Sequence, residues 1–209
     1  MSPSEKRVWT TGRKMIGNLL PLLLSAPLLY PAAIAFGDGG FRQAPFYYWL
    51  GGFVATAWLL VGLLGLTGTG GARNEMGRRL HMERPFDQQA KVFVGFARPS
   101  YKGLLDAHEE VGFLFIHDDE IEYWGETCKV RIRRNDIDEI RFRPNPHSWI
   151  GLGRWICVEA NVSGKPIRLL VEPRQRATMF GNVREGKRLL KELRAWQKQE
   201  PQAEAQGPA

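Results

Sequence analysis

Cysteine is scarce in this sequence, and no paired metal-binding motif accompanies it. Only Cys128 and Cys157 occur in 209 residues, and neither belongs to a CxxC pair or stands next to a paired histidine. This spacing indicates neither a zinc site nor a disulfide framework. We therefore expect two reduced thiols in a cytosolic core.

The short signatures of common enzyme families are also missing. No nucleophile elbow, Walker loop or HExxH motif occurs, and the Gly-x-Gly at Gly151 and Gly153 is not completed to a dinucleotide fingerprint. The acidic run at 118–120 is typical of a turn. The histidines are scattered through expected linker and turn segments, where we expect solvated side chains: His81, His108, His117 and His147. The sequence thus predicts no catalytic residue, no metal, no cofactor and no enzymatic activity.

A concentrated basic face, as nucleic-acid-binding domains carry, is not evident either. The net charge of +7 divides into +3 over residues 1–14, zero over 15–72 and +4 beyond. Lysine and arginine in the last part are interleaved with aspartate and glutamate, and no nucleic-acid-binding module is recognisable. We therefore expect no nucleic-acid partner.

Charge is absent from two long stretches near the N-terminus. Residues 15–37 and 43–72 contain no ionisable Asp, Glu, Lys or Arg. An ionised side chain at the centre of a membrane helix costs roughly 2.5 to 3.5 kcal/mol, and about 20 apolar residues span the hydrocarbon core. Residues 47–66 meet both conditions, and 15–36 would reach about 33 Å as a helix. The sequence predicts a two-helix transmembrane hairpin over 15–72, with a first helix kinked by its prolines, Pro21, Pro27 and Pro31.

The basic flanks of the hairpin predict its orientation. Four basic residues lie in the arm 1–14, whereas the connection between the two spans contains a single basic residue, Arg42. Four more follow the second span: Arg73, Arg78, Arg79 and Arg84. The positive-inside rule therefore places both termini and the C-terminal domain on the cytoplasmic side of a cell (inner) membrane. The alternative is that residues 1–35 are a cleaved signal peptide, although the apolar run exceeds the usual length of such a segment.

Small residues form a narrow stripe along the second span. They recur at spacings of four and three, with one aromatic residue among them: Gly51, Ala55, Trp58, Gly62 and Gly65. Such a stripe permits close contact between helices. We expect it to pack against the first span, and a homo-oligomer seam is the alternative.

A glycine-rich and then basic segment follows the hairpin. We expect residues 73–85 to be a mobile linker near the anionic leaflet, where Glu75 and Glu83 weaken the attraction to lipid. At the other end of the chain, residues 200–209 have nothing to bury and are expected to be disordered.

From residue 91 the hydrophobic period changes to two. Seven alternating runs, separated by turn residues, predict antiparallel strands near 92–96, 113–115, 121–123, 130–132, 140–142, 156–158 and 167–171. Leu189, Leu193 and Trp196 then follow a helical spacing. The predicted fold is membrane-anchored α+β: two N-terminal transmembrane helices, then a seven-stranded antiparallel barrel or sandwich over 86–199, capped by a C-terminal helix.

This order of elements resembles the pleckstrin-homology (PH)-like superfold, including its GRAM-type and bacterial PH-type relatives. Residues 112–140, GFLFIHDDEIEYWGETCKVRIRRNDIDEI, are the most similar stretch. The resemblance implies two near-orthogonal sheets with the Leu189, Leu193 and Trp196 face filling one corner. Phosphoinositide-binding members gather basic residues at the first hairpin, whereas this chain has only Arg98 and Lys102 there among several acidic residues. The resemblance therefore does not imply phosphoinositide binding.

One constellation is a candidate interaction face. If Val130 and Ile132 face the core, alternation turns five basic side chains outward on what we take to be two adjacent strands: Lys129, Arg131, Arg133, Arg141 and Arg143. This face would suit an acidic protein partner or anionic lipid headgroups, and a solvated surface is the alternative. We therefore expect a membrane protein that presents a cytosolic binding or scaffolding domain. The alternative is an accessory or regulatory subunit of a membrane enzyme or transporter that acts through its transmembrane helices.

Overall fold

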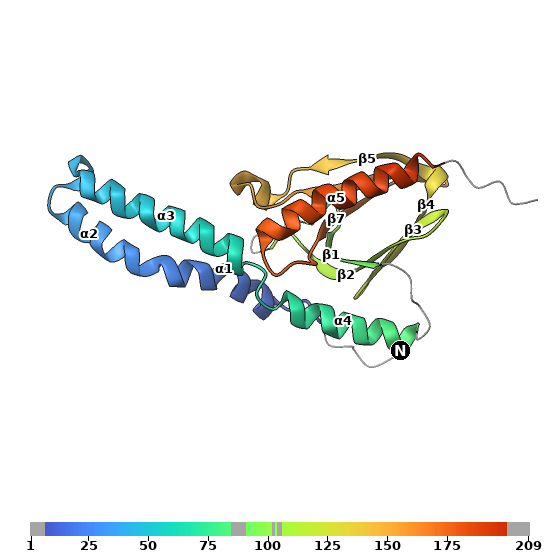
Figure 1. The fold of residues 1–209 in the computed structure, drawn as a ribbon, viewed down its shortest axis with the longest axis horizontal. Coiled ribbons are helices and arrows are strands. Elements are labelled where there is room, and N and C mark those ends of the chain that lie inside the picture. Colours follow the sequence, from blue (N-terminus) through green and yellow to red (C-terminus); the bar gives the residue numbers. More distant parts are fainter. Residues whose placement is uncertain (1–6, 85–90, 102, 104–105, 200–209) are drawn as a thin grey trace, which may run out of the picture.

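A helical hairpin projects from one end of a β-sheet domain (Figure 1). The computed structural model describes residues 7–84, 91–101, 103 and 106–199. The first arm of the hairpin consists of α1 (Thr11–Ser25), the 3₁₀ turn η1 (Ala26–Leu28) and α2 (Leu29–Gly37). After η2 (Gly40–Arg42), α3 (Ala44–Leu64) forms the second arm. The expected interruption of the first helix is present at η1, whose second residue, Pro27, has no N–H to continue the α-helical hydrogen bonds.

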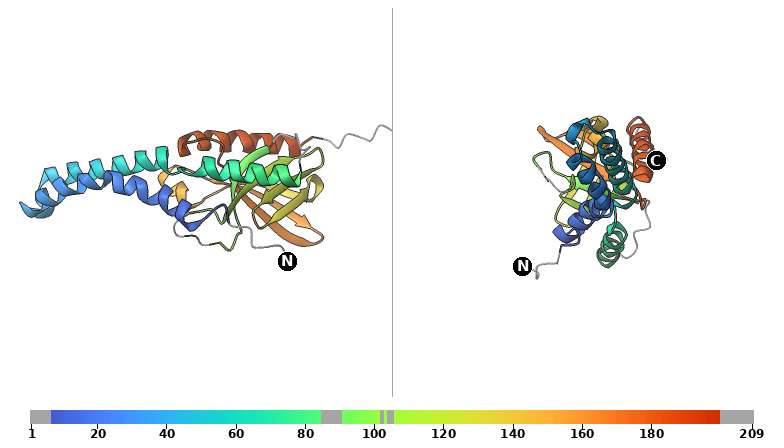
Figure 2. Two further views of the ribbon diagram at one scale, coloured as in Figure 1. Left: turned by 90° about the horizontal axis from the view of Figure 1, so that it is seen from below. Right: turned by 90° about the vertical axis from the view of Figure 1, so that its left-hand side faces the viewer.

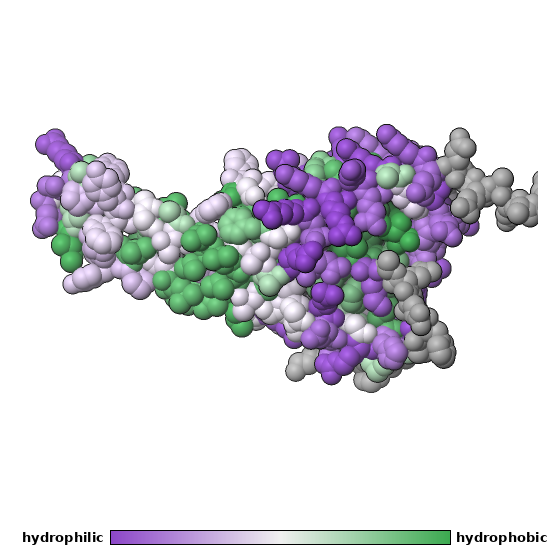
Figure 3. All heavy atoms as spheres, viewed as in Figure 1, coloured by the Kyte–Doolittle hydropathy of each residue, from purple (hydrophilic) through white to green (hydrophobic). Residues whose placement is uncertain are grey.

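Both arms are long and apolar enough to cross a membrane, as the segments Thr11–Gly37 and Ala44–Glu83 show. Little of their apolar surface is covered, since Leu23 is 69% exposed and Tyr48 is 77% exposed. Hydrophobic residues accordingly gather along the hairpin surface (Figure 3). At the tip of the hairpin, the ring centroids of Phe36, Phe41 and Phe46 lie 5.0 to 5.6 Å from one another.

The predicted linker is a helix. After the left-handed turn at Gly68 (φ 90°), α4 covers Thr69–Glu83 and buries Ala72, Met76 and Leu80. These residues recur every fourth position and therefore share one helix face, which packs against four aromatic side chains of the sheet: Phe93, Phe113, Phe115 and Trp124. The expected mobility of 73–85 is wrong for the described part of that segment, because this apolar face is buried.

All seven predicted strands are present. They are β1 (Lys91–Ala97), β2 (Glu110–Ile116), β3 (Glu120–Gly125), β4 (Lys129–Arg133), β5 (Ile137–Arg143), β6 (Trp155–Val162) and β7 (Lys165–Pro173). Every pairing is antiparallel, and the order across the sheet is β4-β3-β2-β1-β7-β6-β5. The strands thus form one continuous open sheet rather than a closed barrel or two separate sheets, because β1 pairs with β2 on one side and with β7 on the other. In the described chain, β4 and β5 are joined by η3 (Arg134–Asp136) but form the two edges.

Two helices cover opposite faces of this sheet. α5 (Met179–Gln197) buries Leu189, Leu193 and Trp196 in the main core, as the periodicity predicts. The Trp196 indole N–H also donates to the His117 carbonyl at 2.6 Å. Because neighbouring residues of a strand point to opposite sides, Val94 and Leu114 face α5 while Phe93 and Phe113 face α4. Figure 2 shows the two helices running along the sheet in the direction of the hairpin.

Candidate functional site

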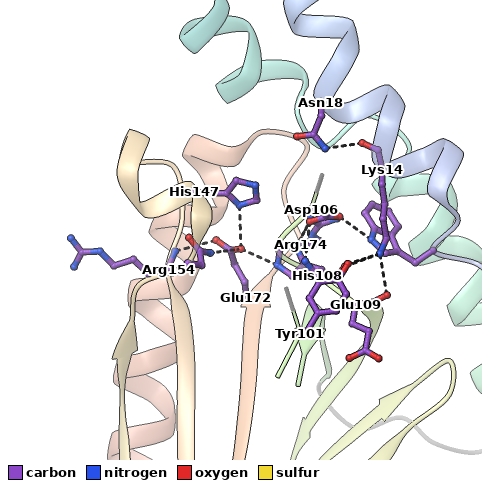
Figure 4. Close-up of polar contacts among 12 residues, drawn as sticks. Lys14, Asn18, Tyr101, Asp106, His108, Glu109, His147, Arg154, Glu172 and Arg174 are labelled. Carbon is purple, nitrogen blue, oxygen red and sulfur yellow. Dashed lines mark hydrogen bonds and ion pairs between the residues drawn. The ribbon is translucent and has the colours of Figure 1, made fainter. Parts of the chain in front are cut away.

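A cluster of buried charged side chains lies where the hairpin meets the domain (Figure 4). Asp106 and His108 come from the connection between β1 and β2. Glu172 lies at the end of β7, and Arg174 directly follows that strand. All four side chains are buried. We call this cluster, together with Trp9 of the N-terminal arm, the junction.

Asp106 is the centre of the junction. Its carboxylate accepts hydrogen bonds from Arg174 Nη2 at 3.1 Å and from Trp9 Nε1 at 2.9 Å, and His108 Nδ1 lies 2.7 Å away. Burial raises the pKa of Asp106, but the charges of Arg174 and His108 outweigh it and hold this pKa well below its ordinary value. The Arg174 guanidinium also lies over the Trp9 ring, 4.5 Å from its centroid. An ionised Asp106 thus fixes the arm that precedes α1 against the sheet.

Glu172 connects β7 to the segment between β5 and β6. Its carboxylate accepts from Asn145 Nδ2 at 3.0 Å and from the Arg154 backbone N–H at 3.1 Å, and His108 Nε2 lies 2.9 Å away. Burial raises the pKa of Glu172, yet the neighbouring rings of His108 and His147 outweigh it and lower this pKa to about 2. A methyl group at Gly153 would overlap the carboxylate, so glycine is required for this close approach.

The expectation of solvated histidines is wrong for His108, whose side chain is 1% exposed. His147 is also largely covered. The fold brings the β1–β2 and β5–β6 connections together, and this proximity cannot be read from their positions in the chain. One sequence feature could have indicated the burial of Glu172: this residue directly follows the apolar run LLV in β7. A carboxylate that continues a buried strand needs a polar partner, because an unpaired buried charge is costly.

Further contacts hold the start of the hairpin on the domain. Lys14 Nζ donates to the His108 carbonyl at 2.9 Å and to the Tyr101 hydroxyl at 3.2 Å (Figure 4). Before it, the backbone N–H groups of Val8 and Trp9 donate to the Glu126 carboxylate at 2.6 and 2.8 Å. The hairpin and the domain are therefore joined by side-chain contacts in addition to the chain itself.

A cavity of about 280 Å³ opens on the face of the sheet opposite α5, beside the junction. Three arginines line it, Arg98, Arg143 and Arg168, together with Tyr101 and Trp155. Arg143 and Arg168 both reach the same carboxylate, that of Glu159, at 2.5 and 3.4 Å. Glu159 also pairs with Arg141, whereas Arg98 pairs with Glu109 at 3.5 Å. Because a single carboxylate is shared by several guanidinium groups, the cavity wall has an excess of positive charge that an acidic group could neutralise.

The five predicted basic residues do not lie on adjacent strands. Lys129, Arg131 and Arg133 belong to β4 and Arg141 and Arg143 to β5, which are opposite edges of the sheet. The premise of adjacency is wrong because the order of strands depends on pairings between distant residues.

Several of these cations already have acidic partners. Lys129 pairs with Glu83 at 2.6 Å, Arg131 with Glu122 at 3.1 Å, and Arg141 with Glu139 at 3.1 Å. The expected mutual repulsion is therefore offset at these positions. Arg133 is exposed on β4, whereas Arg143 is brought into the cavity. A role of the five residues in binding stays a prediction.

The small-residue stripe of α3 divides into two parts. Gly51 and Ala55 are exposed. Nearer the domain, the ring of Trp58 lies 5.3 Å from that of Phe180 at the start of α5, and a methyl group at Gly62 would overlap the same ring. Gly65 faces α1, since a methyl group at Gly17 would lie 2.6 Å from the Gly65 carbonyl oxygen. The stripe thus contributes both to the hairpin and to its contact with α5.

Neither a protein-family model nor a curated protein sequence matches this chain. Within the described residues, no group of three or more His, Cys, Asp or Glu side chains is placed to hold a metal ion. The candidate sites are therefore the junction and the arginine-lined cavity next to it.

Proposed function

We propose that this protein is an integral membrane protein whose hairpin holds a cytoplasmic, PH-like binding or scaffolding domain at a fixed position beside the bilayer. The observation that carries the proposal is an exposed apolar hairpin fastened to the domain by the buried charges of the junction. A flexible tether would not need a buried, paired Asp106, because burying charges is costly unless they are held in a defined geometry. Seven antiparallel strands followed by a helix over the core support the PH-like assignment.

The basic flanks support a cytoplasmic location of both termini and of the domain. Cysteine labelling tests this orientation in intact cells, with Asp38→Cys at the hairpin tip and Lys165→Cys in the domain. We expect a membrane-impermeant reagent to label Asp38→Cys from outside and Lys165→Cys only after permeabilisation. Labelling of Lys165→Cys in sealed cells would contradict the orientation.

The arginine-lined cavity is the proposed binding site for an acidic group, carried by a protein partner or by a lipid headgroup. Its excess positive charge and its place beside the junction support this assignment. A photo-crosslinking amino acid at Pro99, an exposed residue of the cavity wall, would capture the bound group in native membranes. We expect an adduct that is reduced at least about tenfold by Arg143→Gln with Arg168→Gln.

Arg184→Gln with Arg188→Gln is the matched control, because it likewise removes two positive charges, from exposed positions of α5 outside the cavity. A protein adduct identifies a protein partner, and a lipid adduct identifies a headgroup. Equal adducts in the cavity variant and the control would contradict binding in the cavity.

A second candidate is an accessory subunit that acts through its membrane helices. It is favoured by the exposure of Gly51 and Ala55 on the apolar arm of the hairpin. Gly51→Ile with Ala55→Ile would block close approach of another helix there. Loss of a co-purifying membrane partner in this variant, with the Pro99 adduct retained, would favour the accessory function.

A further inference from the structure

One tryptophan is exposed on a short turn that is fixed by side-chain hydrogen bonds. Trp149 lies in η4 (Pro146–Ile150), between β5 and β6, and is 92% exposed. The turn beneath it is well fixed: the Ser148 hydroxyl accepts from the Asn145 N–H at 2.8 Å and donates to the Gly153 carbonyl at 2.8 Å. Gly151 closes the turn in the left-handed region at φ 74°. The exposed indole is therefore presented by a rigid element rather than by a loose loop.

The turn lies against the apolar hairpin. The Trp58 indole N–H of α3 donates to the Ile150 carbonyl at 2.8 Å. Trp58 stands six residues before Leu64, the last residue of α3. At 1.5 Å per residue, this contact is about 9 Å along the helix from its domain-side end.

That distance determines where a bilayer would meet the domain. The 21 residues of α3 extend about 31 Å, close to the roughly 30 Å of a hydrocarbon core. If α3 crosses the bilayer, Trp58 lies within the hydrocarbon core, near its boundary on the side of the domain. Because Trp58 is bonded to Ile150, η4 lies at the same depth in the membrane. Trp149 and the neighbouring Ile150, which is 43% exposed, would then be next to lipid.

We infer that η4 is a third membrane contact, with Trp149 and Ile150 inserted at the boundary between headgroups and acyl chains. This inference rests on the proposed membrane anchoring of the hairpin. Tryptophan is suited to the position, because its indole is apolar over most of its surface and carries one N–H donor for the headgroup region. Lipid is favoured over a protein partner because the turn is bonded to the proposed membrane-spanning helix itself.

Nitroxide accessibility tests the inference on the full-length protein, reconstituted in vesicles of phosphatidylcholine and phosphatidylglycerol. Single labels at Trp149→Cys, Leu23→Cys and Lys165→Cys are compared in a background without Cys128 and Cys157. Leu23 reports on the hairpin, and Lys165 reports on the exposed turn at the other end of β6. We expect the collision ratio of oxygen over a water-soluble nickel chelate to be several-fold higher at 149 and at 23 than at 165.

The outcomes separate this inference from the proposed function. A lipid-like ratio at 23 with a water-like ratio at 149 would overturn the η4 contact alone. A water-like ratio at 23 would overturn membrane anchoring and the inference together. A label at 149 that is shielded from both reagents, with spin–spin broadening that disappears on dilution with unlabelled protein, would show that a second copy covers the turn and would also overturn the inference.

Discussion

At the scale of single residues, Glu172 makes the stability of the domain sensitive to acid. Its pKa is lowered to about 2 from an ordinary value of 4.5, so its stabilisation is complete above about pH 4.5 and is lost as the pH falls through 2. The shift corresponds to at most about 3 kcal/mol, of which roughly 2 kcal/mol are lost by about pH 3. Thermal unfolding in detergent, followed by circular dichroism at about pH 6 and about pH 3, measures this loss.

Glu172→Gln is the informative variant. It removes the titrating group and should be less stable than the wild type at neutral pH, because His108 and Asn145 lose a charged partner. Its melting temperature should then fall less between neutral and acidic pH than that of the wild type. Parallel acid dependence in the two proteins would show that other carboxylates cause the loss.

Gly95 is a second residue whose identity is fixed by the junction. It lies in β1, and a methyl group on it would overlap the His108 ring, which is itself held by Asp106. We expect Gly95→Ala to destabilise the domain by about 1 to 3 kcal/mol, the usual cost of overpacking. Gly51→Ala is the control, because its methyl group would meet no atom within 4 Å. Equal melting temperatures in the two variants would contradict this account.

At the scale of elements, α4 is expected to be a structural part of the domain. Met76 and Leu80 are almost completely buried against the sheet, whereas Met82 on the same helix is 74% exposed. We expect Met76→Ala and Leu80→Ala each to cost about 2 to 5 kcal/mol in unfolding free energy. Met82→Ala should change stability by less than about 0.5 kcal/mol. Chemical denaturation of the three variants in detergent provides the comparison.

The elements could be predicted from the sequence wherever local spacing determines them. Alternation identified the seven strands, and the Leu189, Leu193 and Trp196 face identified α5. The sequence also contains the spacing that determines α4, because Ala72, Met76 and Leu80 recur every fourth residue. The many glycines and charged residues around them led to the prediction of a linker instead. Three predicted parts lie outside the described residues: residue 85, expected to end the linker, residues 86–90, expected to begin the PH-like domain, and residues 200–209, expected to be disordered.

The junction and the cavity could not be predicted in the same way. Asp106, Glu172 and Trp9 come from segments that are far apart in the chain, and only the pairing of β1 with β7 brings the first two together. The separation of β4 and β5 likewise depends on the whole strand order. Local patterns determine an element, whereas a site built from several connections depends on how the elements are assembled.

At the scale of the whole molecule, the junction should set the angle between hairpin and domain. Lys14 and Glu126 are the two outer attachments, and both can be removed without emptying the core, because neither side chain is fully buried. We expect Lys14→Met with Glu126→Ala to leave the secondary structure unchanged but to loosen the hairpin. The reason is that the bonds of Lys14 and Glu126 are lost, while the Trp9 indole bond to Asp106 and the Trp58 indole bond to the Ile150 carbonyl remain.

Distances between spin labels at Leu23→Cys and Lys165→Cys, measured by pulsed dipolar spectroscopy in nanodiscs, test this expectation. The wild type should give one narrow distribution, because buried charged contacts hold a defined geometry. The double variant should give a clearly broader one, with an unchanged circular dichroism spectrum. Lys187→Met with Glu192→Ala makes the same charge changes on exposed positions of α5 and should keep the narrow distribution. A distribution that stays narrow in the Lys14 and Glu126 variant would mean that the packing of α3 on α5 fixes the angle, and the positioning role assigned to these two attachments would be wrong.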